Sequence, residues 1–177
     1  MPDHDLPLIL PKLLPRLWRF AIRLARHQQD AEDLVQRTCV RALERRHQYQ
    51  EGSAVLSWLF SIMHSIWLNE IRTRQVRRNG QLEWDDDSIE LIDNGMEGNP
   101  EHDLFYRQVI AAVEALPEAQ RSVMLLVAVE GLSYREAAEI LDIPLGTIMS
   151  RLARARISIG EKFNPHSTES HSSEKSS

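Results

Sequence analysis

Apolar residues recur every three or four positions through most of this chain, which is the spacing of one face of an α-helix. The first such stretch covers residues 6–25, although Pro11 within it should make its start irregular. A second helix is predicted to begin at Asp30, because aspartate is a good N-cap residue, and to end near Arg46. The pattern therefore predicts a helical first half.

The third predicted helix, residues 54–76, follows a polar loop at 47–53 and is apolar over most of its circumference, so we expect it in the middle of a bundle. Its end turns abruptly basic, with Arg72, Arg74, Arg77 and Arg78. An arginine cluster of this kind suits a surface that follows a nucleic-acid backbone. Trp67 fits either base stacking or the core, and the pattern leaves both open.

Residues 80–100 break the helical pattern and predict a flexible acidic linker. Positions 81–104 hold nine Asp and Glu and no Lys or Arg, whereas the first 80 residues hold 13 Lys and Arg against 8 Asp and Glu. The net charge of -5 therefore hides a basic first half, and this distribution keeps nucleic acid among the candidate partners.

The second half predicts short helices over 101–115 and 117–130, followed by a helix-turn-helix at 131–156. Ser133 and Glu136 have the spacing of a capping box, and Pro144 suits the first turn of the next helix. That helix should bury Leu145, Ile148, Leu152 and Ala155 and show Gly146, Ser150, Ala153 and Arg154, flanked by Thr147, Met149 and Arg151. Such a helix can enter a major groove, but an ordinary helical hairpin with a basic face has the same spacing.

Several classes of site are absent from the pattern. Cys39 is the single cysteine, so neither an internal disulfide nor a cysteine metal site can form. The seven histidines do not pair at ligand spacing, and no phosphate-binding loop, dinucleotide fingerprint or nucleophile motif occurs. We therefore expect no catalytic residue, no metal and no cofactor. The chain shows neither a signal peptide nor a membrane span, which predicts a cytoplasmic protein.

Four stretches in order resemble the bacterial sigma factors of the extracytoplasmic-function type: Asp30–Gln36, Ser57–Ile62, Ala115–Glu118 with Arg121, and Gly131–Arg156. The resemblance implies an all-α fold with two small helical domains, sigma domain 2 and sigma domain 4 with its helix-turn-helix. The expected boundaries are 1–79 for domain 2, 80–100 for the linker, 101–163 for domain 4 and 164–177 for a disordered tail.

The resemblance also implies sites, each carried over by matching position. Contacts to the clamp of RNA polymerase would come from Asp33, Gln36 and Arg37. Contacts to the minus-10 promoter element would come from Tyr49, Ser53, Ala54, Ser65, Trp67, Asn69, Arg72, Arg74 and Arg77. Contacts to the minus-35 element would come from Thr147, Met149, Ser150, Arg151, Ala153 and Arg154.

Five positions, at three places along the chain, depart from the family pattern. Arg37 stands where the family usually has an acidic residue, which changes that part of the clamp contact. His64, Ser65 and Asn69 replace an Arg-Asn pair and a following Asp, so minus-10 preference should differ. Met149 replaces a common Lys or Arg, and a thioether cannot donate to guanine, so base readout there should be weaker or rely on DNA shape.

The partners implied are core RNA polymerase, promoter DNA and an anti-sigma factor, with no insertion into a membrane. One alternative is a sigma-like decoy that binds an anti-sigma factor without reading promoters; the arginine cluster counts against it. A second is a helix-turn-helix repressor, which should carry a dimerisation element and an effector pocket that the pattern does not show. An enzyme is the alternative least supported.

Overall fold

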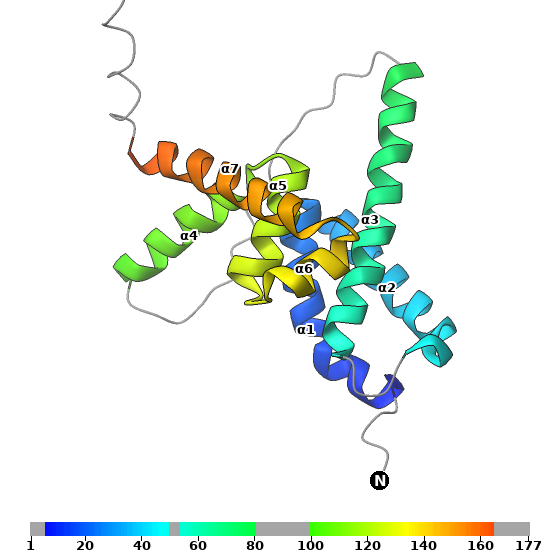
Figure 1. The fold of residues 1–177 in the computed structure, drawn as a ribbon. Coiled ribbons are helices and arrows are strands. Elements are labelled where there is room, and N and C mark those ends of the chain that lie inside the picture. Colours follow the sequence, from blue (N-terminus) through cyan, green and yellow to red (C-terminus); the bar gives the residue numbers. More distant parts are fainter. Residues whose placement is uncertain (1–5, 50–53, 81–99, 165–177) are drawn as a thin grey trace, which may run out of the picture.

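The computed structural model describes residues 6–49, 54–80 and 100–164, and within these ranges the regular structure is entirely helical (Figure 1). The helices are α1 (Leu6–Ala25), α2 (Gln28–Glu44), η1 (Arg46–Gln48), α3 (Val55–Gly80), α4 (Pro100–Glu114), α5 (Glu118–Met124), η2 (Leu125–Val129), α6 (Tyr134–Leu141) and α7 (Leu145–Phe163). The all-α prediction is confirmed. Ser53 and the predictions for residues 81–99 and 165–177 lie outside the described ranges.

The first half is a bundle of α1, α2 and α3. Helix α1 is a single helix even though Pro11 and Pro15 lie inside it. Its buried side packs on α2 and α3, and the rings of Phe20 and Phe60 lie 4.5 Å apart between centroids. None of the helices in the described parts of the chain combines the length and apolarity that crossing a membrane requires.

The predicted start of α2 is wrong. The helix begins at Gln28 with His27 as N-cap, so Asp30 lies inside the first turn. Its carboxylate does not cap the backbone there. Instead it accepts two hydrogen bonds from Arg74, 44 positions along the chain. The Asp30 side chain therefore pairs with Arg74, which is distant in the sequence, and does not cap α2 as the local pattern predicted.

The second half contains α4 to α7. Helix α5 begins after Pro117, which is its N-cap, and continues directly into the π-helical turn η2. Arg121 is buried and donates through Nη1 to the carbonyl oxygens of Glu114 and Leu116, each at 3.1 Å. This guanidinium satisfies the carbonyl group at the end of α4 and one in the turn that follows it, and so joins α4 to α5.

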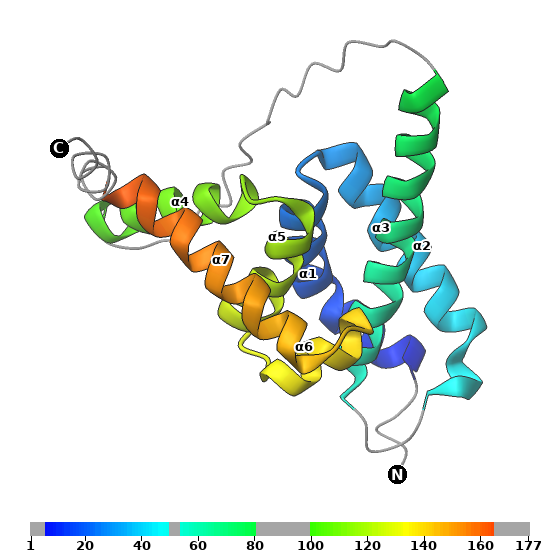
Figure 2. The same ribbon diagram turned by 45° about the horizontal axis from the view of Figure 1, so that its top comes forward.

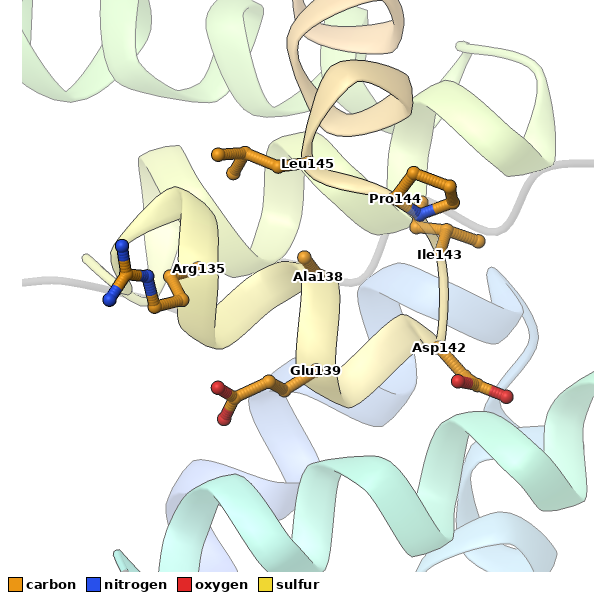
Figure 3. Close-up of a pocket in the computed structure, with 7 residues that line it drawn as sticks. All are labelled: Arg135, Ala138, Glu139, Asp142, Ile143, Pro144 and Leu145. Atoms are coloured by element: carbon orange, nitrogen blue, oxygen red, sulfur yellow. The ribbon is translucent and has the colours of Figure 1, made fainter.

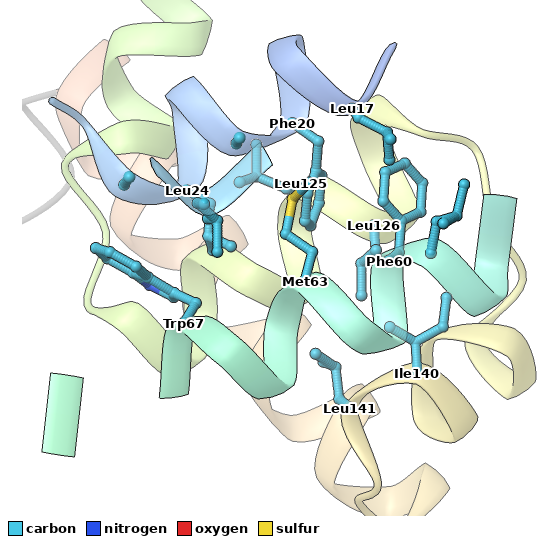
Figure 4. Packing of buried hydrophobic residues seen from close by; sticks show 14 of the residues in the cluster. Leu17, Phe20, Leu24, Phe60, Met63, Trp67, Leu125, Leu126, Ile140 and Leu141 are labelled. Atoms are coloured by element: carbon cyan, nitrogen blue, oxygen red, sulfur yellow. The ribbon is translucent and has the colours of Figure 1, made fainter. Parts of the chain in front are cut away.

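The two halves pack against each other, a feature that the sequence analysis did not predict. Phe60, Met63 and Trp67 of α3 belong to the same buried cluster as residues of η2 and α6, namely Leu125, Leu126, Ile140 and Leu141 (Figure 4). Helix α6 packs on α3, and α1 contacts α5 and η2 (Figures 1 and 2). We call this packing of residues 6–80 on residues 100–164 the closed arrangement.

Candidate nucleic-acid interface

The helix-turn-helix is formed by α6 and α7, and local hydrogen bonds fix where α6 begins. The Ser133 hydroxyl accepts from the Glu136 amide at 3.2 Å, and the Glu136 carboxylate accepts from the Ser133 amide at 2.8 Å. This is the capping box that the sequence predicts. Hydrogen bonding from the backbone amide of Ser133, and from its side chain, lowers the pKa of the Glu136 carboxyl group.

The turn between the two helices is set by a left-handed residue. Asp142 has φ 52° and ψ 49°, a conformation that aspartate tolerates better than most side chains. Its amide donates to Glu139 and the Ile143 amide donates to Ala138, which together form a Schellman motif. An open groove of about 480 Å³ follows the turn, lined by Arg135, Ala138, Glu139, Asp142, Ile143, Pro144 and Leu145 (Figure 3).

Helix α7 has one buried and one exposed face. Ile148, Leu152 and Ala155 are at most 1% exposed, as predicted, and anchor the helix in the core. The opposite face exposes Met149, Ser150, Ala153 and Arg154, while Thr147 and Arg151 are half-buried. Leu145 is wrong in the predicted set, because it is 45% exposed at the start of the helix, where it lines the groove. The exposed face presents small and polar side chains that allow close approach to base edges.

A second exposed surface runs along α3. Ser65, Asn69 and Arg72 are exposed and follow helical spacing, so they form one stripe, and Arg77 is exposed near the end of the helix. Near the start of α3, Ala54 is exposed and the half-buried Tyr49 packs on Trp58, with ring centroids 5.4 Å apart.

Two of the minus-10 candidates, Arg74 and Trp67, are not on this exposed surface. Arg74 donates to Asp30 at 2.9 and 2.7 Å and to Glu70 at 3.0 Å, which lowers the pKa of Asp30 and raises that of Arg74. Trp67 is 5% exposed, and its indole nitrogen donates to Glu118 Oε1 of α5 at 2.8 Å. In the closed arrangement both side chains therefore stabilise the fold.

The candidate clamp contacts lie on the outer side of α2. Gln36 and Asp33 are exposed. Arg37 Nη1 lies 3.3 Å from a carboxylate oxygen of Asp33 and 3.4 Å from one of Glu70 on α3. The arginine that departs from the family pattern therefore pairs with the neighbouring candidate and also links α2 to α3.

Several residues outside the predicted contact sites connect the two halves. Glu130 at the end of η2 pairs with Arg16 of α1, and Glu118 accepts from Trp67 and pairs with Arg121. His64 is 7% exposed, and burial, helped by the charge of Arg151 on α7, lowers its pKa to about 4. These polar side chains show no periodicity in the sequence that would mark them as contacts between the halves. Glu118 and Arg121 were visible only as part of a stretch that resembles the sigma factors.

The described residues contain no group of three or more His, Cys, Asp or Glu side chains that could hold a metal ion. On the inner side of α3, Arg74 pairs with Asp30 and Glu70 and holds α2 against α3. The arrangement offers two exposed helical surfaces, one on α3 and one on α7, carried by a packed helical frame.

Comparisons with known proteins match both halves of the chain. The family model "Sigma-70 region 2" matches residues 11–77, and "Sigma-70, region 4" matches residues 106–159. The ECF RNA polymerase sigma factor EcfG of Rhodopseudomonas palustris is 34% identical over 163 residues, covering 88% of this chain and 87% of the relative. The ECF RNA polymerase sigma-E factor of Escherichia coli is 33% identical over 144 residues, covering 77% of this chain and 75% of the relative.

Two solved sigma-factor structures have a similar arrangement of helices. The sigma factor RpoE of Bartonella quintana, crystallised with the anti-sigma factor NepR, superposes with a TM-score of 0.77 at 30% identity, covering 93% of this chain and 98% of that one. CnrH, solved with the cytosolic domain of CnrY, has a TM-score of 0.59 at 21% identity, covering 91% of this chain and 88% of that one, and shows the fold alone. At 93% coverage, the match to RpoE extends over both halves of this chain.

Proposed function

The chain belongs to the extracytoplasmic-function (ECF) sigma factors of bacterial RNA polymerase. On that premise we propose which of its surfaces contacts the polymerase and which contacts each promoter element. As a sigma factor it binds core polymerase and directs promoter-specific initiation, and the chemistry belongs to the polymerase, so the protein is not an enzyme. We assign the clamp contact to α2, the minus-10 element to α3 with its preceding loop, and the minus-35 element to α7. Its place of action is the bacterial cytoplasm.

The exposed face of α7 carries this proposal. Met149, Ser150 and Ala153 lie where a recognition helix meets base edges, and Arg151 and Arg154 lie beside them for phosphates, with Thr147 one turn before Arg151. Ile148 and Leu152 are buried on the opposite side of α7 and fix its rotation about its axis, so this face stays exposed. No arginine in the exposed face donates to a base in this assignment, so we expect modest affinity from α7 alone.

For the minus-10 element we assign the stripe of Ser65, Asn69 and Arg72, with Arg77 beyond it. Ser65 and Asn69 can hydrogen-bond the edges of unpaired bases, and the two arginines can follow the phosphates of a separated strand. Binding unpaired bases better than paired ones shifts the population of promoter DNA toward the melted state. Trp67 could join this surface only after region 4 has moved away from α3, because its indole donates to Glu118 of α5. Arg74 could join it only by leaving its partners Asp30 and Glu70 within region 2.

The distance between the two promoter elements requires region 4 to move away from region 2. The two promoter elements are centred about 25 base pairs apart, which is about 85 Å of B-form DNA. The longest helix here, α3, has 26 residues, and such a helix is about 39 Å long. In the closed arrangement α6 and α3 are in contact, so the two reading surfaces cannot reach both elements together. The 19 residues between α3 and α4 could extend across about 65 Å, and this tether makes the second contact intramolecular.

We also propose an anti-sigma factor as a partner, because the whole chain in its closed arrangement superposes with a TM-score of 0.77 on RpoE, which was solved in complex with NepR. An anti-sigma factor that binds the closed arrangement would keep α3 and α7 too close together for a promoter. The decoy alternative is not favoured, since Arg72, Arg77 and Arg154 remain exposed and the frame of the helix-turn-helix is complete.

The test is run-off transcription with purified core polymerase and promoter fragments selected from the protein's own genome. Ala153→Glu places a negative charge on the exposed face of α7, and Ala119→Glu places the same charge on the exposed side of α5. We expect Ala153→Glu to abolish promoter-dependent transcripts and Ala119→Glu to leave them unchanged. A wild-type protein that yields no such transcript, yet binds an anti-sigma factor tightly, would support the decoy instead.

A further inference from the structure

Three arginines and one glutamate gather where the end of α1 meets α4 and α5. Arg23 lies in the last turn of α1, Arg26 directly follows that helix, and Arg121 lies on α5. Burial raises the pKa of the carboxyl group of Glu114, the last residue of α4, and the charges of all three arginines oppose this change. The four side chains therefore form one cluster, in which cations outnumber carboxylates.

Arg23 is buried without a carboxylate partner. The residue is 9% exposed, and its Nη2 donates to the Tyr106 hydroxyl of α4 at 3.3 Å, a long hydrogen bond to an uncharged group. Among the residues that the structure describes, no ion pair includes Arg23 or Arg26. A guanidinium has five N–H donors, and a buried cation that lacks an anion is destabilising. Arg23 therefore has donors and charge to spare for a ligand.

Arg26 shows the same feature just after α1. Its backbone has φ 67°, in the left-handed region that is uncommon for residues other than glycine. In the described residues, three buried side-chain nitrogen or oxygen atoms lack a hydrogen-bond partner, and two of them are Nε of Arg26 and Nε of Arg121. Unsatisfied buried donors are thus concentrated in this arginine cluster.

The chain holds these cations close together in spite of their repulsion. Arg121 has structural partners, since it donates to two carbonyl groups and pairs with Glu118. Burial nevertheless lowers the pKa of Arg121, and the like charge of Arg26 acts in the same direction. Like charges repel strongly where little water screens them. An anion between α1 and α4 would offset this repulsion and accept from the unpaired donors.

A phosphate group fits this cluster better than a carboxylate does. Guanidinium groups bind phosphate through paired N–H donors, and a phosphate dianion balances two arginines. Its tetrahedral oxygens can accept from two helices at once, here from Arg23 of α1 and from the hydroxyl of Tyr106 on α4. Tyr106 is 42% exposed, so a small ligand can approach from the surface. The pKa of Glu114, which burial raises, brings its carboxyl group closer to the uncharged form, which donates to a phosphate oxygen.

We propose that Arg23 and Arg26, together with the Tyr106 hydroxyl, form a binding site for a phosphate group, either inorganic phosphate or the phosphate of a nucleotide. The bound group joins the end of α1 to α4 and so stabilises the folded chain. This inference does not depend on which promoter element each helix contacts.

The experiment is isothermal titration calorimetry of the full chain with three probes: inorganic phosphate, pyrophosphate and ATP. All titrations are made in chloride buffer at constant ionic strength. Arg23→Gln and Arg26→Gln each remove one charge of the site, and Arg19→Gln removes the same charge from an exposed position of α1. We expect the first two variants to bind about tenfold more weakly or worse, and Arg19→Gln to stay within about twofold of wild type.

Thermal unfolding of Arg23→Met keeps the test decisive if a glutamine variant folds poorly. Methionine replaces the buried cation with an apolar chain, so without phosphate this variant should melt no lower than wild type. Phosphate at about 100 times its dissociation constant should raise the wild-type Tm by about 5 °C and leave Arg23→Met unchanged. Arg19→Gln measures the general stabilisation by phosphate as a salt, which is subtracted from both.

The three probes also distinguish the two sources of the phosphate group. Tighter binding of ATP than of pyrophosphate assigns the site to a nucleotide, and equal or tighter binding of inorganic phosphate assigns it to the free ion. Either result supports the site if Arg26→Gln weakens it. Absence of binding by all three probes, or equal binding by wild type and Arg26→Gln, overturns the proposal. Binding of a polyglutamate peptide alone would assign the cluster to a protein partner instead.

Discussion

Asp30 and Arg74 are joined by two parallel hydrogen bonds, of 2.7 and 2.9 Å, that connect the first turn of α2 to the second half of α3. The guanidinium of Arg74 also lies 5.7 Å from the centroid of the Trp67 ring. An arginine from the basic cluster therefore stabilises region 2, and Arg72 and Arg77 remain exposed for nucleic acid.

Asp30→Ala should destabilise the protein, because it removes a bidentate partner from Arg74. We expect a loss of about 1–2 kcal/mol in the free energy of unfolding, measured in urea. Asp33→Ala is the control: its carboxylate is 62% exposed and pairs with Arg37 along the same helix, so the loss should stay below about 0.5 kcal/mol. Equal losses in the two variants would contradict the structural role of Asp30.

The Asp30 contact should also depend on pH. Hydrogen bonding to Arg74 holds the pKa of Asp30 below its usual value of 3.8. A carboxyl group whose pKa is lower in the folded state stabilises that state above its unfolded pKa and loses this effect as pH falls through the folded value. The difference in stability between wild type and Asp30→Ala should therefore be constant near neutrality and shrink below about pH 4.

His64 should make the fold sensitive to acid at a higher pH. Burial lowers its pKa from 6.5 to about 4, so the folded protein keeps this imidazole neutral. Below pH 6.5 the unfolded chain binds a proton that the folded chain does not, so stability is full above that pH and falls as pH drops toward 4. The loss should be on the order of 3 kcal/mol.

Thermal unfolding of His64→Leu across this pH range checks the assignment. The variant should be less dependent on pH than wild type, because the group that titrates is gone. His47→Leu, at an exposed position of η1, is the matched control and should keep the wild-type slope. A wild-type slope in His64→Leu would show that other groups cause the acid response.

The orientation of α7 can be tested with two neighbouring residues. Ile148 is 0% exposed and Met149 is 54% exposed. Ile148→Ala should cost about 2–5 kcal/mol of stability, through lost burial and the cavity left behind. Met149→Ala should change stability by less than about 0.5 kcal/mol and alter minus-35 binding instead. A large stability loss in Met149→Ala would mean that the helix is rotated.

Arg154→Ala should weaken binding of minus-35 DNA about equally for all sequences, because the exposed guanidinium is assigned to a phosphate. The slope of log K against log salt concentration should become shallower by about one unit. Binding to a minus-35 duplex at several salt concentrations gives this slope directly. Loss of affinity confined to one base position would instead assign Arg154 to base readout.

The amino-acid sequence by itself determined those features whose causes are local. The capping box of Ser133 and Glu136 predicts the start of α6, because both hydrogen bonds are made within one turn. The apolar spacing of Ile148, Leu152 and Ala155 predicts the buried face of α7, since periodicity is a property of the helix alone. The order of the sigma-like stretches indicated the family that the comparisons then showed.

Only the tertiary structure decided the features that depend on distant partners. Asp30 is a cap candidate until Arg74 approaches from α3, and Trp67 fits a base-stacking surface until its indole donates a hydrogen bond to Glu118 of α5. The pairing of Arg16 with Glu130 joins residues 114 positions apart. No local pattern encodes such contacts, because they follow from how helices that are distant in the chain pack against one another.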